Sequence, residues 1–182
     1  MHHAIALIEL SSIAKGIETA DAMLKSANVE LLAAKSICPG KFIVLVGGDA
    51  ASVEQAAAQG RQAAGHLLVD HFAIARLHPD VLPAISGVTR LEQAAAVGVV
   101  ESYSVAACIE AADLAAKAAE VTLIRIHLAF GIGGKCYFVL SGDVAAVASA
   151  IEVAAHSAGE KGLLVQQTVI PRPAPALLAS LL

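Results

Sequence analysis

The sequence predicts an α+β protein made of two copies of one small domain. The chain repeats itself, because the stretch from Ala6 to about Pro83 aligns with the stretch from Gly98 to Leu181. Within each copy, short apolar runs typical of strands alternate with segments of helical periodicity, in the same order. A repeat of about ninety residues is also too long for a solenoid unit, which favours two fused domains.

The alignment keeps residue identity at many positions, with two small insertions in the second copy. The offset is 92 at first, then 94, and finally 96. Matched pairs include Glu9 with Glu101, Asp21 with Asp113, Lys25 with Lys117, Lys41 with Lys135, Asp49 with Asp143, and Arg76 with Arg172.

The first half of the first copy reads as strand, helix, strand. An apolar run at residues 4–9 predicts the first strand, and Ser11-Ser12 can cap the helix that follows. That helix carries a stripe with a period of 3.6 residues, formed by Ile13, Ile17, Ala20 and Leu24. Residues 31–36 form the next predicted strand.

The second half of the first copy reads as strand, helix, strand. The turn 37–41 leads into a strand at 42–46, and Asp49 caps a helix over 52–64 that Gly65 ends. Residues 66–75 form the last predicted strand of the copy.

The second copy repeats this order, with Ser104, Asp143 and Gly159 in the roles of Ser12, Asp49 and Gly65. The pattern favours a split βαβ, ferredoxin-like arrangement in each copy. We place the first domain at residues 1–87, a partly helical linker at 88–95, and the second domain at 96–182.

The composition of the chain excludes several classes of function. The chain is 57% hydrophobic with a mean hydropathy of +0.71, but its apolar runs are too short for a transmembrane helix. The excess apolar surface therefore predicts self-association. A net charge of −4 argues against nucleic-acid binding, and no secretory signal is expected. Three cysteines without disulfide spacing indicate a reducing compartment.

Several segments resemble the bacterial microcompartment shell-domain pattern. In the first copy these are Ala-Ile-Ala-Leu-Ile-Glu at 4–9, Ala-Asp-Ala-Met-Leu-Lys at 20–25 and Gly-Gly-Asp at 47–49. The second copy has Val-Gly-Val-Val-Glu at 97–101, Ala-Ala-Asp-Leu-Ala-Ala-Lys at 111–117 and Val-Ile-Pro-Arg-Pro at 169–173. With Ser-Ile-Cys-Pro-Gly-Lys at 36–41, the non-permuted chain most resembles the tandem-domain iron–sulfur members of that family.

The resemblance implies a homotrimer whose six domains mimic a flat hexamer, in contact edge to edge with other shell proteins of a compartment inside the cytoplasm. It also implies two sets of positions. The pore-loop set is Ser36, Ile37, Cys38, Pro39, Gly40, Lys41, Gly131, Ile132, Gly133 and Gly134. The tile-edge set is Lys25, Lys117, Arg76 and Arg172.

Cys38 aligns with Ile132, so a trimer would bring three Cys38 thiols and three Ile132 side chains to its axis. The resemblance favours one [4Fe-4S] cluster per trimer, although three thiolates and water also suit Zn²⁺. The expected role is one-electron transfer across the shell, with an encapsulated or cytosolic redox enzyme as a partner, or donation of the cluster. Lys41 and Lys135 are expected to offset the charge of the cluster. We read Cys108 and Cys136 as core residues.

No catalytic residue is predicted, so the chain is not expected to be an enzyme. Glu9 and Glu101 occupy equivalent points of the duplicated strands, which favours a structural role. The glycines at 131–134 do not complete a phosphate loop, because Ala129 and Cys136 break the Walker pattern. Two alternatives stay open: a shell pore for small metabolites without a cluster, and an oligomeric ferredoxin-like sensor of small molecules.

Overall fold

Each copy folds as strand, helix, strand, strand, helix, strand, which confirms the predicted α+β class. The computed structural model describes residues 3–89 and 94–181. The first copy consists of β1 (Ala4–Leu10), α1 (Ile13–Ser26), β2 (Glu30–Ile37), β3 (Lys41–Gly48), α2 (Ala50–Ala64), the 3-10 turn η1 (Gly65–Leu67), β4 (Leu68–Ile74) and α3 (Val81–Ser86). The second consists of β5 (Ala96–Ser102), α4 (Val105–Ala118), β6 (Val121–His127), β7 (Cys136–Gly142), α5 (Val144–Glu160), β8 (Leu164–Pro171) and α6 (Pro175–Leu181).

The duplication extends to strand register. The two sheets are antiparallel, with strand orders β2-β3-β1-β4 and β6-β7-β5-β8. Ala4 pairs with Gly48 in the first sheet, and the equivalent Ala96 pairs with Gly142 in the second. Even the irregularity that follows Glu9 in β1 recurs after Glu101 in β5.

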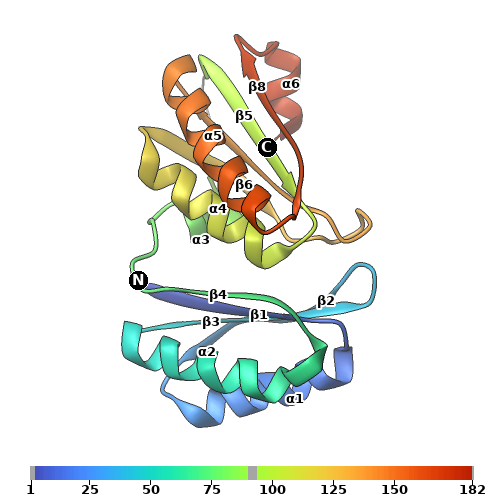
Figure 1. Ribbon diagram of the computed structural model, residues 1–182. Helices are drawn as coiled ribbons and strands as arrows, with labels where there is room; N and C mark the ends of the chain where they lie inside the picture. The colour runs from blue at the N-terminus through green and yellow to red at the C-terminus, as the bar shows by residue number, and fades with distance from the viewer. Residues whose placement is uncertain (1–2, 90–93, 182) are drawn as a thin grey trace. The chain divides into compact units, whose positions relative to one another are not determined.

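Helices α1 and α2 cover one face of the first sheet, and α4 and α5 cover the equivalent face of the second (Figure 1). Alternate residues of β1 point toward the helices, because successive side chains of a strand point to opposite faces. They pack with residues of α1 and α2 in one buried cluster, which includes Ile8, Leu10, Met23, Val44 and Val53.

The predicted helix starts are confirmed, with one difference in hydrogen bonding. The hydroxyls of Ser12 and Ser104 accept from the backbone N–H groups of Lys15 and Ala107. Asp49 accepts from the N–H and the hydroxyl of Ser52, which lowers the pKa of that carboxyl below 3.8. Asp143 also stands at an N-cap, but its side chain makes no cap hydrogen bond.

One predicted helix end was wrong, and most of the apolar stripe of α1 is exposed. Gly159 does not end its helix, since α5 continues to Glu160 and Lys161 is the C-cap. Of the apolar stripe of α1, Ala20 faces the core, whereas Ile13, Ile17 and Leu24 are 44%, 60% and 38% exposed. The other buried residues of α1 are Gly16, Thr19 and Met23.

The chain divides into two compact units whose limits differ from the repeat. The first holds residues up to Leu77 and also Phe130–Gly134, and the second holds His78–Ala129 and the residues from Lys135 on. Helix α3 therefore packs with the second copy, although it follows the last strand of the first. Of the predicted linker at 88–95, residues 90–93 lie outside the described part.

Helix α1 approaches the first sheet closely at Gly16, where a Cβ atom would lie 2.7 Å from Phe42 Cβ. Gly16→Ala is therefore expected to reduce the free energy of unfolding by about 1–2 kcal/mol, because overpacking outweighs the gain in helix propensity. The matched control is Gly159→Ala, where a Cβ would meet nothing within 4 Å. That change should stabilise α5 by about 0.5–1 kcal/mol. Urea unfolding of both variants measures the difference, and equal effects would contradict the close approach.

Candidate functional site

Cys38 lies at the tip of the hairpin that joins β2 to β3. Ile37 and Lys41 form the last cross-strand pair, and the N–H of Gly40 donates to the carbonyl oxygen of Ile37 at 3.0 Å. Gly40 has a φ of 86°, a left-handed conformation that favours glycine. Cys38 is half-buried, whereas Pro39 is exposed, so the tip of the turn is partly open to solvent.

The equivalent loop of the second copy belongs to the same compact unit as Cys38 and lies against it. A Cβ atom on Gly134 would stand 2.7 Å from Pro39 Cδ and 2.8 Å from the carbonyl oxygen of Cys38. Only a residue without a side chain fits there, and Gly134 also has a φ of 84°. The two loops that the sequence aligned are therefore neighbours within one chain.

One ion pair anchors each loop at its base, and the pair is duplicated with the fold. Lys41 binds Glu9 on β1, where the Glu9 side chain is fully buried and that of Lys41 is 14% exposed. Lys135 binds Glu101 on β5 at 2.6 Å, with side chains 37% and 27% exposed. The structural role expected for the two glutamates agrees with these pairs.

These ion pairs argue against the expectation that Lys41 and Lys135 offset the charge of a cluster. Each ammonium group is already matched by a carboxylate, so neither lysine is a free positive charge for a bound anion. The hydrogen bond and the charge of Glu101 raise the pKa of Lys135 above 10.5. The stability that this raised pKa contributes is therefore present at neutral pH and is lost as the pH rises through the raised value.

One chain contributes a single thiol, that of Cys38, as a possible metal ligand at this site. Cys108 and Cys136 are fully buried, on α4 and at the start of β7, as predicted for core residues. Within the described residues no group of three His, Cys, Asp or Glu side chains could hold a metal ion. A soft thiolate at this loop tip has the right chemistry for iron or zinc, but only several copies together could complete the ligand set.

The four predicted tile-edge residues are on the surface. Lys25 is 74% exposed and pairs with Asp21 at 2.6 Å, while Lys117 is 39% exposed and pairs with the buried Asp113. Arg76 and Arg172 follow β4 and β8 and are also exposed. The backbone N–H of Arg172 donates to the carbonyl oxygen of Ala95 at 2.8 Å.

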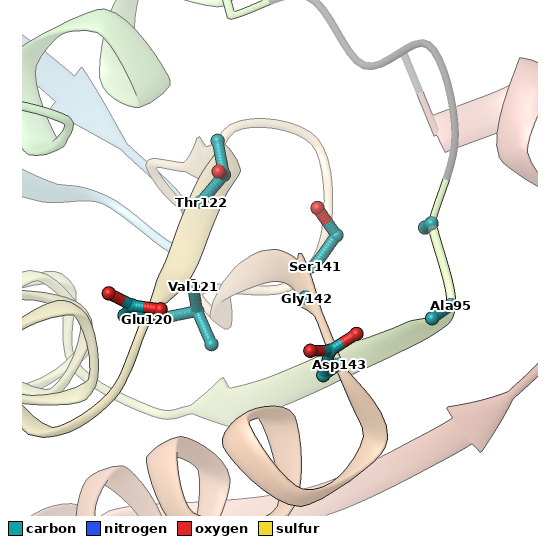
Figure 2. A pocket seen from close by; sticks show the side chains of 8 residues that line it. Ala95, Glu120, Val121, Thr122, Ser141, Gly142 and Asp143 are labelled. Carbon is teal, nitrogen blue, oxygen red and sulfur yellow. The ribbon is translucent and has the colours of Figure 1, made fainter.

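An open cavity of about 590 Å³ lies in the second unit, away from the loops. Figure 2 shows its lining, which includes Glu120, Thr122, Ser141 and Asp143. The register places this cavity where Val121 pairs with Gly142, at the opposite end of the β6–β7 hairpin from the 130–134 loop. The cavity is therefore not part of the Cys38 site.

Sequence reasoning missed three features of the loops. The close approach of Gly134 to Cys38 depends on tertiary structure and has no local signal. Phe130, at the start of the second loop, is 73% exposed. His127 and Tyr137 close the base of this loop with stacked rings, whose centroids are 5.2 Å apart. Opposite aromatic positions across a hairpin could have indicated this stack.

The contributions of the two ion pairs to stability can be compared through the same substitution in each pair. Glu9→Gln is expected to lower the free energy of unfolding by about 3 kcal/mol, because the nearly buried Lys41 would lose its counter-charge. Glu101→Gln should have a smaller effect, since water reaches both members of that pair. Chemical denaturation of the two variants measures the difference, and losses of equal size would contradict this account of the buried pair.

The described part of the chain holds no helix that is both long and apolar enough to cross a membrane. Comparison with protein families finds the BMC domain twice, at residues 4–77 and 96–173. Each match runs from the first strand of a copy to just beyond its last strand.

Two full-length comparisons agree with that match. The chain is 60% identical to the bacterial microcompartment shell protein PduT of Citrobacter freundii, over 95% of this chain and 94% of that protein. A crystal structure of a microcompartments protein from Desulfitobacterium hafniense DCB superposes with a TM-score of 0.87 and 47% identity, over 97% and 98% of the two chains.

A more distant structure shares the fold alone. It is the fused permuted hexameric shell protein MSM0275 from the RMM microcompartment, with a TM-score of 0.62 and 20% identity over 85% of this chain and 81% of that one. From the two matched domains and the full-length relatives, the chain belongs to the bacterial microcompartment shell protein family and carries two BMC domains in tandem.

Proposed function

We propose that the chain is a homotrimeric tile of a microcompartment shell and binds one [4Fe-4S] cluster at the pore of the trimer. Three Cys38 thiolates, one from each copy, would hold the cluster. The cluster would supply one-electron transfer between the two sides of the shell. The observation that carries the proposal is the position of Cys38, a half-buried thiol at the tip of the loop that aligns with the Ile132 loop of the second copy.

The contact between the two loops supports a shared pore. Gly134 lies against the Cys38–Pro39 segment, so the cysteine loop and the glycine loop occupy neighbouring positions. Three copies around an axis would alternate these loops, and three identical thiols would converge without any Cys-x-x-Cys motif. Three protein ligands leave one iron of a cubane for water, a small molecule or a partner.

The loop geometry supports a proposed role for each of these residues. Cys38 binds iron, Gly40 permits the tight turn, and Gly134 permits the close approach of the second loop. The two lysine–glutamate pairs hold the bases of the loops, so the tips are supported on rigid strands. Ile132 takes the alternate positions at the axis and excludes water there.

The exposed residues Lys25, Lys117, Arg76 and Arg172 are proposed to contact neighbouring tiles in the shell. Long cationic side chains at an edge can reach carbonyl groups and carboxylates across a flat junction. A redox enzyme on one side of the shell would exchange electrons with the cluster. In this proposal the chain itself needs no catalytic residue.

Iron and acid-labile sulfide analysis of anaerobically purified protein tests the cluster directly. We expect about four iron atoms and four sulfides for every three chains, with broad visible absorption. Cys38→Ser should remove both the iron and the absorption and leave the oligomer intact. The control is Cys108→Ala, which removes a thiol that is fully buried on α4 and should keep the iron.

Three results would contradict the cluster. The first is a Cys38→Ser protein that keeps its colour and its iron. The second is a colourless wild-type oligomer with zinc in place of iron, which would fit the same thiolates. The third is a metal-free oligomer, which would favour a pore for small metabolites.

A further inference from the structure

The two buried cysteines of the second copy occupy positions whose equivalents contact each other in the first copy. We infer that Cys108 and Cys136 form a modification site, at which a peroxide converts the two thiols into a disulfide that joins α4 to β7. The inference concerns the core of the second copy and does not depend on a cluster at Cys38.

The equivalents of the two cysteines are Gly16 and Phe42. The alignment pairs Cys108 with Gly16 at an offset of 92, and Cys136 with Phe42 at an offset of 94. In the first copy these two positions meet closely, because a Cβ atom on Gly16 would lie 2.7 Å from the Cβ of Phe42. The repeat therefore brings the side chains of the two cysteines face to face.

The helix position is the same in both copies. The backbone N–H of Cys108 donates to the carbonyl oxygen of Ser104 at 3.1 Å, and that of Gly16 donates to the carbonyl oxygen of Ser12 at 3.0 Å. Both serines are N-caps whose hydroxyls accept from the first turn of the helix. Cys108 thus starts its helix from the same cap geometry as its equivalent.

The strand position is also the same. Cys136 pairs with Ser102 across β5 and β7, as Phe42 pairs with Leu10 across β1 and β3. Phe42 belongs to the buried cluster that β1 and β3 share with α1 and α2. Because the register is kept, Cys136 points to the helix-covered face of its own sheet.

The two copies fill this contact with different pairs of side chains. The first copy combines a glycine with a large aromatic ring, and the second copy has two small thiols, both fully buried. The Cβ atoms of disulfide-bonded cysteines are roughly 3.5–4.5 Å apart. A separation of α4 from β7 about 1 Å wider than the first copy has would bring the two Cβ atoms into that range.

Hydrogen peroxide supplies the oxidising equivalents for the bond. The sulfur of one thiol attacks a peroxide oxygen, the O–O bond breaks, and a sulfenic acid and one water form. The sulfur of the second thiol attacks the sulfenic sulfur, so that the S–S bond forms and the S–O bond breaks. The leaving hydroxyl takes the proton of the second thiol and departs as water. The thiol pair is oxidised by two electrons, and the peroxide is reduced to two waters.

Both cysteines stand near the ends of their elements, which shortens the path for a small oxidant. Cys108 is the fourth residue of α4, and Cys136 is the first residue of β7. Tyr103, which precedes the cap of α4, is 56% exposed. Ends of helices and strands open at a lower free energy than the whole fold, so peroxide can meet these thiols while the domain stays folded.

The disulfide would fasten the base of the second loop. Cys136 directly follows Lys135, whose ammonium group binds Glu101 at 2.6 Å. The bond would close the chain between residues 108 and 136, which include that loop, into a covalent ring. Such a ring lowers the conformational entropy of the unfolded chain, so the oxidised protein should be more stable.

Peptide mapping tests the pairing, because trypsin separates the three cysteines onto peptides 36–41, 91–117 and 136–161. Native full-length protein is treated with hydrogen peroxide, and its remaining thiols are blocked before digestion. Mass spectrometry should find peptide 91–117 joined to 136–161, lighter by two hydrogen atoms than their sum, until dithiothreitol separates them. A denaturing gel without reductant should show a single chain, and Cys108→Ala and Cys136→Ala should each abolish the joined peptides.

Thermal unfolding measures the effect on stability. The Cys38→Ser chain is used, so that no change at the loop thiol contributes to the result. Oxidation should raise its Tm by about 5–10 °C, because the unfolded chain is cross-linked, and dithiothreitol should reverse the rise. The matched control is the double variant Cys38→Ser with Cys108→Ala, whose Tm peroxide should not raise.

Three results would overturn the inference. The first is a folded wild-type protein whose peptides 91–117 and 136–161 stay separate at peroxide concentrations that oxidise Cys38. The second is a joined pair that forms only after urea has unfolded the chain. The third is a pair that forms but lowers the Tm, because the two thiols would then not face each other in the native domain.

Discussion

Two equivalent domains joined in one chain must place equivalent surfaces in different surroundings, and this constraint governs most of the structure. The strand registers, the irregularity after Glu9 and after Glu101, and the serine caps are the same in both copies. Burial is not the same. Ile17 on α1 is 60% exposed, whereas its equivalent Ile109 is fully buried. Such a difference between identical folds shows where the surroundings, rather than the fold, determine packing.

The lysine–glutamate pairs, in contrast, keep the same contact in both copies, although one pair is more buried than the other. Each pair joins the first strand of a copy to the base of its loop, so the loop tip can change while its anchor stays. The tips have changed in part, since Cys38 and Pro39 align with Ile132 and Gly133, whereas the glycine that follows, Gly40 or Gly134, is kept with a positive φ in both copies. In the first copy, loss of Lys41 would leave the charge of Glu9 buried without its partner, which explains why that anchor is kept.

Local patterns were enough to predict the order of elements, the caps at Ser12, Ser104 and Asp49, and the core positions of Cys108 and Cys136. These depend on residues close together in sequence. The orientation of the α1 stripe could not be predicted, because periodicity identifies an apolar face but not whether the core or another chain covers it. The contact of Gly134 with Cys38 and the pairing of Lys41 with Glu9 join residues far apart in sequence.

The pairing of the loop lysines bears on the kind of ligand that the loop tips could hold. If Lys41 and Lys135 were free, the site would attract anions in general, and a metabolite carboxylate or phosphate would compete with any metal centre. With both ammonium groups neutralised by glutamates, the tips offer a thiol, backbone groups and apolar side chains. Selectivity at such a site must come from the soft sulfur donor and from the number of copies that converge. In the proposed trimer, fusion of two domains would set that number, because it would restrict the cysteine to every second loop of the ring.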